Sequence, residues 1–177
     1  MEFRDPPLRD ALSSAALARM SEFAAREISS PAWSCAKLPV RDGPLLHALS
    51  SSAIRRMGDF GSMDLVNTAW AFSTLEVHDE PLSDAIAAAA LSKLSEYAPP
   101  EIANIAWSCA KSLVAPDSPL IDAIASEALP KLAECAPHDL ACTAWSCAKI
   151  RFGDPPLRDA IAAAAIPTMS LYTSQNL

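Results

Sequence analysis

Apolar residues recur along the chain at the spacing of an amphipathic helix, in blocks that repeat regularly. In residues 82–97 the apolar positions follow the i, i+3, i+4, i+7, i+8 pattern, which places them on one helical face. They are Leu82, Ala85, Ile86, Ala89, Ala90, Leu94 and Tyr97. A Pro-Leu pair opens each block, and proline is favoured in the first turn of a helix. Each block is therefore predicted to form a helix of about sixteen residues.

A shorter helix of about eleven residues is predicted after each of these blocks, and it is centred on a tryptophan. All four tryptophans lie in versions of one motif: Trp33, Trp70, Trp107 and Trp145. Their spacing is 37, 37 and 38 residues. Five Pro-Leu pairs keep the same step, with their prolines at Pro7, Pro44, Pro81, Pro119 and Pro156. Self-similarity of this length indicates a helical-repeat array.

Two helices joined by a short loop form an αα-hairpin, and stacked hairpins form an α-solenoid. The sequence therefore predicts an all-α fold, a single α-solenoid over residues 5–177 with repeats of 37–38 residues. The predicted units are residues 5–42, 43–79, 80–117, 118–154 and a partial unit, 155–177. Asp5 and Asp154 precede Pro pairs and are expected to cap the helices that follow. Residues 173–177 align with the start of another tryptophan helix.

Charge and cysteine content narrow the class of protein. The chain has 14 basic and 21 acidic residues, and a net charge of -7 argues against a strongly basic nucleic-acid binder, although it does not describe where the charges lie. The chain contains no apolar run of about 18 residues, so no membrane span is predicted, and no signal or transit segment is visible.

Three of the five cysteines, Cys35, Cys109 and Cys147, lie two residues after a tryptophan. We interpret them as small buried apolar side chains.

Counting 100° per residue from each tryptophan separates two faces of the tryptophan helix. Positions −5, −1, +2 and +3 form the predicted core face. Positions −3, +1 and +4 lie on the opposite side and form a predicted polar ladder across the repeats. The ladder supplies the candidate RNA-binding residues: Lys37, Asn67, Thr74, Asn104, Ser108, Lys111, Ser146 and Lys149. The three lysines in this set are expected to contact phosphates.

Two interpretations of the ladder remain open. One set of polar side chains per repeat is the arrangement with which helical-repeat RNA-binding proteins read bases. A solvated face without a ligand explains the same pattern. For the tryptophans, the corresponding alternatives are packing between repeats and stacking on bases.

The sequence gives no sign of an enzyme. It contains no Gly-rich phosphate loop, no HExxH and no GxSxG motif. Four aspartates recur at one repeat position instead of forming a single centre: Asp10, Asp84, Asp122 and Asp159. No zinc-type ligand set is apparent among the cysteines and histidines. We therefore predict no catalytic activity, no cofactor and no metal.

The motif Asn67-Thr68-Ala69-Trp70-Ala71-Phe72 recurs as Asn104-Ile105-Ala106-Trp107-Ser108, each followed by a Pro-Leu helix. This pattern resembles the octotricopeptide-like repeats. It is also similar to the tryptophan-containing helical arrays of organellar proteins with RAP domains and of RNA-editing substrate-binding complex subunits. The resemblance covers residues 5–177 and implies an α-solenoid of a mitochondrion or plastid that binds RNA or builds ribonucleoproteins. The chain departs from the pattern in its few repeats, its acidic charge and the lack of a RAP domain in residues 1–177.

Two functional hypotheses follow from these observations. The first is a module that binds single-stranded RNA in organellar RNA metabolism. The second is a protein-interaction scaffold or structural subunit of a large assembly, with no direct RNA contact. It is motivated by the acidic balance and by the apolar C-terminal helix. The surface of this helix (Ile161, Ile166, Met169, Leu171) is expected to meet more protein, either in the same chain or in another subunit.

Overall fold

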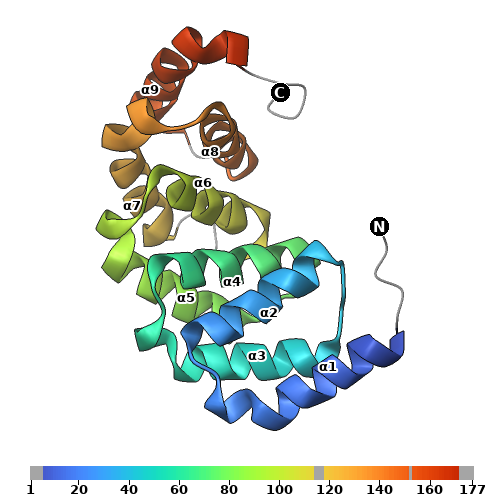
Figure 1. Ribbon diagram of the computed structural model, residues 1–177. Coiled ribbons are helices and arrows are strands. Elements are labelled where there is room, and N and C mark those ends of the chain that lie inside the picture. The colour runs from blue at the N-terminus through green and yellow to red at the C-terminus, as the bar shows by residue number, and fades with distance from the viewer. Residues whose placement is uncertain (1–5, 114–117, 152, 172–177) are drawn as a thin grey trace. The chain divides into compact units, whose positions relative to one another are not determined.

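The computed structural model describes residues 6–113, 118–151 and 153–171, and within these ranges every regular element is helical (Figure 1). The α-helices are α1 (Pro6–Arg19), α2 (Ala25–Lys37), α3 (Gly43–Arg55), α4 (Ser62–Leu75), α5 (Glu80–Lys93), α6 (Pro99–Ser108), α7 (Pro119–Ala128), α8 (Pro137–Lys149) and α9 (Pro155–Ala165). The odd-numbered helices contain the Pro-Leu pairs and are called A helices here. The even-numbered ones contain the tryptophans and are called Trp helices. This order confirms the predicted all-α helical-repeat fold.

Each A helix continues into a short 3-10 helix before the chain turns. These segments are Met20–Glu22, Met57–Asp59, Leu94–Glu96, Leu129–Glu134 and Ile166–Leu171. Phe60 and Tyr97 follow two of them in extended conformation, and their side chains are 0% and 1% exposed. A buried aromatic side chain at this point fixes the turn against the core because it removes a large apolar area from water. One Trp helix also continues in another form, since α6 passes into a π-helix at Cys109–Leu113.

Aspartates cap three of the A helices, α3, α5 and α9, and Ser118 caps α7. Asp42, Asp79 and Asp154 each accept a hydrogen bond from the backbone N–H three residues later, at 3.1, 3.0 and 2.8 Å. Such caps satisfy backbone donors that have no partner within the helix. The predicted cap at Asp154 is confirmed, whereas Asp5 and residues 173–177 lie outside the described residues.

The Trp helices are capped by a carboxylate in their first turn. Glu27, Asp64, Glu101 and Asp139 share one repeat position, six residues before the tryptophan. Each accepts a hydrogen bond from the backbone N–H three residues earlier, at 2.8, 3.3, 2.7 and 3.1 Å respectively. A carboxylate there also faces the positive end of the helix dipole. Two repeats, α3–α4 and α5–α6, therefore start both of their helices with an acidic side chain, which accounts for part of the negative net charge.

Residues 1–89 form one compact unit, in which α2 and α4 pack side by side with α1 and α3 beneath them (Figure 1). The predicted core positions of both Trp helices are buried: Ile28, Ala32, Cys35, Ala36, Leu65, Ala69, Phe72 and Ser73. The small residues at position −1, Ala32 and Ala69, are fully buried. The prediction of the core face is confirmed in this unit.

Residues 90–177 form the second compact unit, in which α6 packs against α8. The predicted core positions of α6 are again buried: Ile102, Ala106, Cys109 and Ala110. In α8, Leu140 is buried but Ala144 and Ala148 are exposed and Cys147 is half-buried. The core prediction is therefore wrong for most of this face of α8. The reason is that α2 and α6 are each followed by a Trp helix that packs against them, whereas the described residues contain none after α8.

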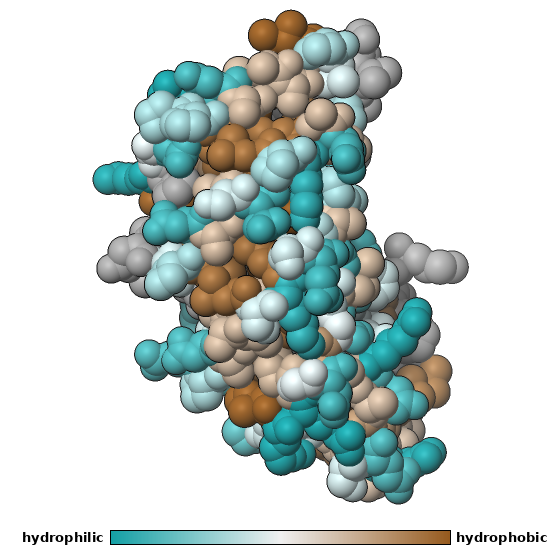
Figure 2. Space-filling view, turned by 90° about the vertical axis from the view of Figure 1, so that its left-hand side faces the viewer, coloured by the Kyte–Doolittle hydropathy of each residue, from teal (hydrophilic) through white to brown (hydrophobic). Residues whose placement is uncertain are grey.

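Apolar side chains also reach the surface, where they lie between hydrophilic residues (Figure 2). The large ones that are at least about a third exposed are Leu8, Leu12, Leu17, Trp33, Leu38, Ile54, Met63, Leu91, Trp145 and Ile166. Single exposed apolar residues are common on proteins. Leu12, Leu38 and Ile166 are among the most exposed of this set, with 58%, 48% and 70% of their area open to solvent.

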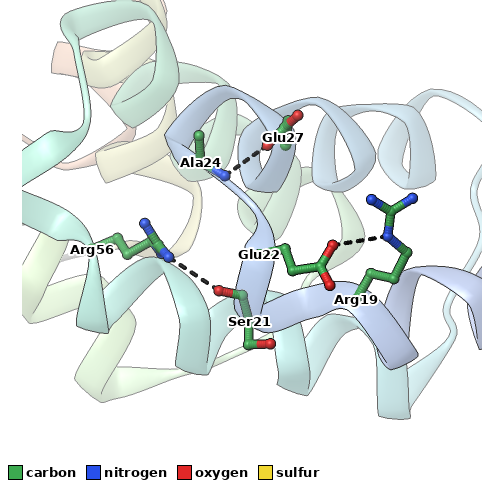
Figure 3. Close-up of polar contacts among 6 residues, drawn as sticks. All are labelled: Arg19, Ser21, Glu22, Ala24, Glu27 and Arg56. Atoms are coloured by element: carbon green, nitrogen blue, oxygen red, sulfur yellow. Dashed lines mark hydrogen bonds and ion pairs between the residues drawn. The ribbon is translucent and has the colours of Figure 1, made fainter.

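Basic side chains at the ends of two A helices, α3 and α7, tie these helices to the turn of the preceding repeat. Arg56 donates a hydrogen bond of 3.1 Å to the backbone carbonyl of Ser21 (Figure 3). One unit later, Lys131 donates to the carbonyls of Ser95 and Tyr97, at 3.1 and 2.8 Å. Arg56 and Lys131 occupy the same repeat position, as do Ser21 and Ser95. This contact between successive repeats therefore recurs in both units.

Candidate nucleic-acid interface

The tryptophans of neighbouring repeats pack against one another within each unit, tilted in the first unit and stacked in the second. The ring centroids of Trp33 and Trp70 are 6.4 Å apart with an interplanar angle of 37°. Those of Trp107 and Trp145 are 6.2 Å apart at 29°. Aromatic pairs at this distance contribute roughly 0.5–1.5 kcal/mol beyond the area that they bury. Packing between repeats, one of the two interpretations of the tryptophans, is thus confirmed for both pairs.

In each unit a lysine four residues after a tryptophan lies over that tryptophan's ring, and Lys37 also lies over the second ring of its pair. Lys37 Nζ is 5.4 Å from the Trp33 ring centroid and 5.7 Å from that of Trp70. Lys111 Nζ is 5.2 Å from the Trp107 centroid. Residues four apart share a helical face, so the motif itself brings the lysine over its own ring. A cation–π contact holds the ammonium group near the rings without removing its charge.

The outer Trp of each pair keeps a large part of its surface open. Trp33 is 40% exposed and Trp145 is 45% exposed, while Trp70 and Trp107 are half-buried. An aromatic face that is open to solvent and lies beside an ammonium group is the combination that binds single-stranded nucleic acids, in which bases stack and phosphates pair with cations. Each unit presents one such cluster: Trp33, Trp70 and Lys37 in the first, and Trp107, Trp145 and Lys111 in the second.

The line of solvent-facing residues on the Trp helices differs from the predicted ladder. It follows positions −7, −3, 0 and +4, because these are the positions that are exposed or half-buried in all four helices. Position −3 supplies Asn67 and Asn104, both half-buried. Position +4 supplies the exposed Lys37 and Lys149 and the half-buried Thr74 and Lys111. These six predicted residues are therefore on or near the surface that carries the tryptophans.

Position +1 is not part of that surface, which corrects the prediction for Ser108 and Ser146. Their side chains are 0% and 2% exposed, and each hydroxyl donates to the backbone carbonyl four residues earlier, at 2.8 and 2.6 Å. Ala71, at the same position in α4, is also fully buried. A side chain with no solvent exposure cannot reach a ligand while the helices stay packed. Ser108 and Ser146 are therefore left out of the interface.

The hydroxyl group of Thr74 lacks a hydrogen-bond partner. Its hydroxyl oxygen is buried and has no hydrogen-bond partner, although the residue as a whole is half-buried. An unsatisfied buried hydroxyl costs roughly 1–3 kcal/mol. Sequence reasoning missed this because threonine at +4 corresponds to lysine in the other three repeats, and nothing in the sequence signals how far the shorter side chain is covered.

Acidic residues of the A helices lie away from this surface. Asp10, Asp84, Asp122 and Asp159 are all exposed on A helices, whereas the lysines over the rings are on Trp helices. These four carboxylates are therefore on other helices than the lysines, although each Trp helix has one capping carboxylate in its own first turn. A net charge of -7 is therefore compatible with a locally basic, aromatic surface.

The cysteines are unsuited to nucleophilic chemistry. Burial raises the pKa of the Cys109 thiol from its ordinary 9.0 to about 12. Burial, with a smaller effect of Asp139 and Glu134, raises the pKa of Cys135 to about 11. Since the thiolate is the reactive form, both thiols are unreactive near neutral pH. The predicted burial of the cysteines after the tryptophans is confirmed for Cys35 and Cys109, and Cys147 is half-buried.

The described part of the chain contains neither a cluster of metal-ligating side chains nor a helix that could span a membrane. No three His, Cys, Asp or Glu side chains come together there as a metal site would require. No helix in the described ranges is both long enough and apolar enough to cross a bilayer.

The chain matches a model of a known protein family. The family model described as RNA-editing substrate-binding complex 6 protein matches residues 1–116. This range includes the first three tryptophans and Lys37, Asn67, Thr74, Asn104, Ser108 and Lys111. No curated protein matches the chain significantly. The match confirms the RNA-editing part of the resemblance, while the octotricopeptide-like part stays a prediction.

Proposed function

The chain belongs to the RNA-editing substrate-binding complex 6 protein family, and we propose that it is a helical-repeat module that binds single-stranded RNA through its Trp-helix surface. The observation that carries the proposal is that each unit holds a pair of contacting tryptophan rings with a lysine over at least one of them. Bases would stack on the open faces of Trp33 and Trp145. Phosphates would pair with Lys37, Lys111 and Lys149.

The chemistry of the surface decides which nucleic acid it suits. Stacking requires unpaired bases, so single strands fit and duplexes do not. The half-buried amides of Asn67 and Asn104 lie at position −3, next to the rings on the same face, and can donate to or accept from base edges. With few charges involved, binding is expected to be weak per unit and sensitive to salt.

The proposal is tested by fluorescence anisotropy with labelled single-stranded RNA at several salt concentrations. Replacing Lys37, Lys111 and Lys149 by Ala should weaken binding and lower the salt slope by about 2, since each phosphate contact on a single strand contributes about 0.7. A matched control replaces Arg19, Arg41 and Arg158 by Ala, which removes the same charge from exposed ion pairs elsewhere. If both triple variants lost the same RNA affinity, net charge alone would explain the binding and the proposal would be wrong.

Stacking is tested separately. Trp145→Leu should weaken binding about tenfold, because stacking of one base contributes roughly 1–3 kcal/mol. Trp145→Phe keeps an aromatic face and should retain most of the affinity. If the Leu and Phe variants bind alike, the exposed ring is not a stacking platform.

A second candidate function is a scaffold subunit without RNA contact, and one observation favours it. Ala144 and Ala148 are exposed on a face that is buried in the other Trp helices, and Ile166 lies 70% exposed after α9. Absence of RNA binding even at low salt would favour this candidate.

Neither candidate includes catalysis. Location in a mitochondrion or plastid also belongs to the proposal, and imaging of the tagged protein in its own cells would test it.

A further inference from the structure

A groove in the first unit is lined by three basic residues. It has a volume of about 260 Å³. Arg41 lines it from the link after α2, His78 from the link after α4, and His47 from α3. All three residues are exposed, so a ligand in the groove can reach them from solvent.

The other side of the groove is apolar. Leu46 and Phe72, each 3% exposed, line it together with the half-buried Val77. Ligand sites in proteins commonly combine an apolar lining with a few polar groups that fix the orientation of the ligand. This groove therefore suits a small molecule with one charged group and one apolar part.

The two links hold their basic residues in the same way. Arg41 and His78 occupy the same repeat position, one repeat apart. Each follows a valine whose backbone N–H donates to the carbonyl five residues earlier in the preceding Trp helix. The bond from Val40 to Cys35 is 2.8 Å long, and the bond from Val77 to Phe72 is 3.0 Å long. Both links are thus tied to a helix end, and the groove does not depend on a free loop.

His47 departs from the repeat pattern at a position where the other repeats are acidic. The equivalent residues of the other A helices are Asp10, Asp84, Asp122 and Asp159. An aspartate here would repel an anion, whereas an imidazole can donate a hydrogen bond to it. The change of residue therefore makes this one groove more suitable for an anion.

The carboxylates near the groove already have partners. Asp79 lines it, but Oδ1 accepts from the backbone N–H of Leu82 at 3.0 Å and Oδ2 accepts from the Ser50 hydroxyl. Glu76 pairs with Arg41 at 3.6 Å, and both side chains are about 60% exposed. An exposed pair of this kind is weak, and a guanidinium has five N–H donors. Arg41 can therefore donate to a ligand as well.

From these observations we propose that the groove binds a phosphomonoester on a small organic group, as in a nucleoside monophosphate or the phosphorylated end of an RNA. The three terminal oxygens of the ester accept from Arg41, His47 and His78, and its organic part contacts Leu46 and Phe72. A diester within a strand offers fewer terminal oxygens and less charge, so it fits less well. The site shares no residue with the proposed Trp-helix surface and goes beyond that function.

The test follows the histidine ring signals of the full chain by NMR during titration with adenosine 5′-monophosphate (AMP). His47 and His78 should shift together with one Kd of about 0.1–1 mM. His138, the third histidine of the chain, lies on α8 and should not shift. Adenosine, which lacks the phosphate, is the matched ligand and should cause no shift. A shift of all three histidines, no shift at all, or an equal response to adenosine would overturn the proposal.

Three variants assign the site. His47→Asp restores the residue of the other repeats and should weaken AMP binding at least about tenfold, as should Arg41→Gln. Arg19→Gln is the control, since Arg19 is also an exposed arginine paired with a carboxylate, Glu22 at 3.0 Å. It should bind AMP like the unaltered chain. If Arg19→Gln weakened binding as much as Arg41→Gln, net charge would explain the effect and the site would be wrong. All three positions are exposed, and thermal unfolding checks that the variants stay folded.

The source of the phosphate is decided by two short single-stranded RNAs, one with a 5′-phosphate and one with hydroxyl groups at both ends. Shifts of His47 and His78 with the first RNA alone would make the strand end a ligand, and a response to AMP without this difference would point to a free nucleotide. Zinc that shifted both histidines while AMP did not would replace the proposal by a metal site.

The AMP titration involves no RNA, so it can succeed where the Trp-helix proposal fails, and the reverse. RNA with hydroxyl groups at both ends carries no monoester. Its binding should therefore be insensitive to Arg41→Ala, which keeps the triple control of the anisotropy test valid.

Discussion

Ser13 on α1 donates a hydrogen bond of 2.6 Å from its Oγ to Oδ2 of Asp42, the residue that caps α3 with its other oxygen. One repeat later, Ser50 donates in the same way to Asp79, the cap of α5. A single aspartate thus joins two functions, since it satisfies a helix end and links successive A helices. The repeat is held together at this point by polar contacts as well as by its core.

The Asp42 cap gives a first prediction. Asp42→Ala should lower the free energy of unfolding by about 1–2 kcal/mol, because the N-cap and the bond from Ser13 are both lost. Thermal unfolding should show a fall of roughly 2–4 °C in Tm per kcal/mol. Asp84→Ala, on an exposed position of α5, is the control and should change stability by less than about 0.5 kcal/mol. Equal effects of the two substitutions would contradict the assigned role.

The link between repeats through Lys131 gives a second prediction. Lys131→Met keeps the aliphatic stem but removes the ammonium group that donates to the Ser95 and Tyr97 carbonyls. We expect a loss of about 1.5–3 kcal/mol, the range for hydrogen bonds that involve a charged group. Urea unfolding measures it.

Arg41→Met provides the comparison for Lys131. Arg41 pairs with Glu76 at 3.6 Å, and both side chains are about 60% exposed, so its loss should cost less than about 1 kcal/mol. If Arg41→Met lowered the free energy of unfolding more than Lys131→Met, the contact of Lys131 with the backbone carbonyls would not be a stabilising feature of the repeat.

The buried +1 position gives a third prediction. Ala71→Leu places a larger side chain on a fully buried site of α4, and overpacking of this kind costs about 1–3 kcal/mol. Ser34→Leu makes a similar change at the same repeat position in α2, where the residue is exposed, and should be nearly neutral. Chemical unfolding at low protein concentration compares them. A harmless Ala71→Leu would show that the helices of this unit are less closely packed than described.

The raised pKa of Cys109 gives a fourth prediction. Below pH 9.0 the thiol is protonated in both the folded and the unfolded chain, so it contributes no pH dependence there. Between 9.0 and about 12 only the unfolded chain releases the proton, so stability falls as the pH rises through this range. Urea unfolding at a series of alkaline pH values measures the slope.

Cys109→Ala tests the assignment of that slope. The substitution should reduce it without abolishing it, because burial also raises the pKa of Tyr97. The thiol itself should react slowly with a water-soluble thiol reagent until the chain unfolds. If the slope of stability against alkaline pH were unchanged in Cys109→Ala, a group other than Cys109 would cause the loss of stability.

The sequence by itself determined the order of the helices, their caps and most of the core. Prolines and aspartates act on the backbone next to them, so their effect can be read locally, as the cap at Asp154 shows. Apolar spacing likewise placed Ile28 and Leu65 correctly, because a buried stripe follows from the helical period alone.

Only the tertiary structure decided which polar positions remain open. A count of 100° per residue treats each helix as if it had one buried side, but a Trp helix in these units packs against an A helix and another Trp helix. Ser108 and Ser146 are therefore buried although the count placed them opposite the core, while Ala148 is exposed although the count placed it inside. The contact of Lys37 with Trp70, which lies on another helix, likewise depends on the distance between the two helices. That distance is set by side-chain packing across repeats, which no single stretch of sequence contains.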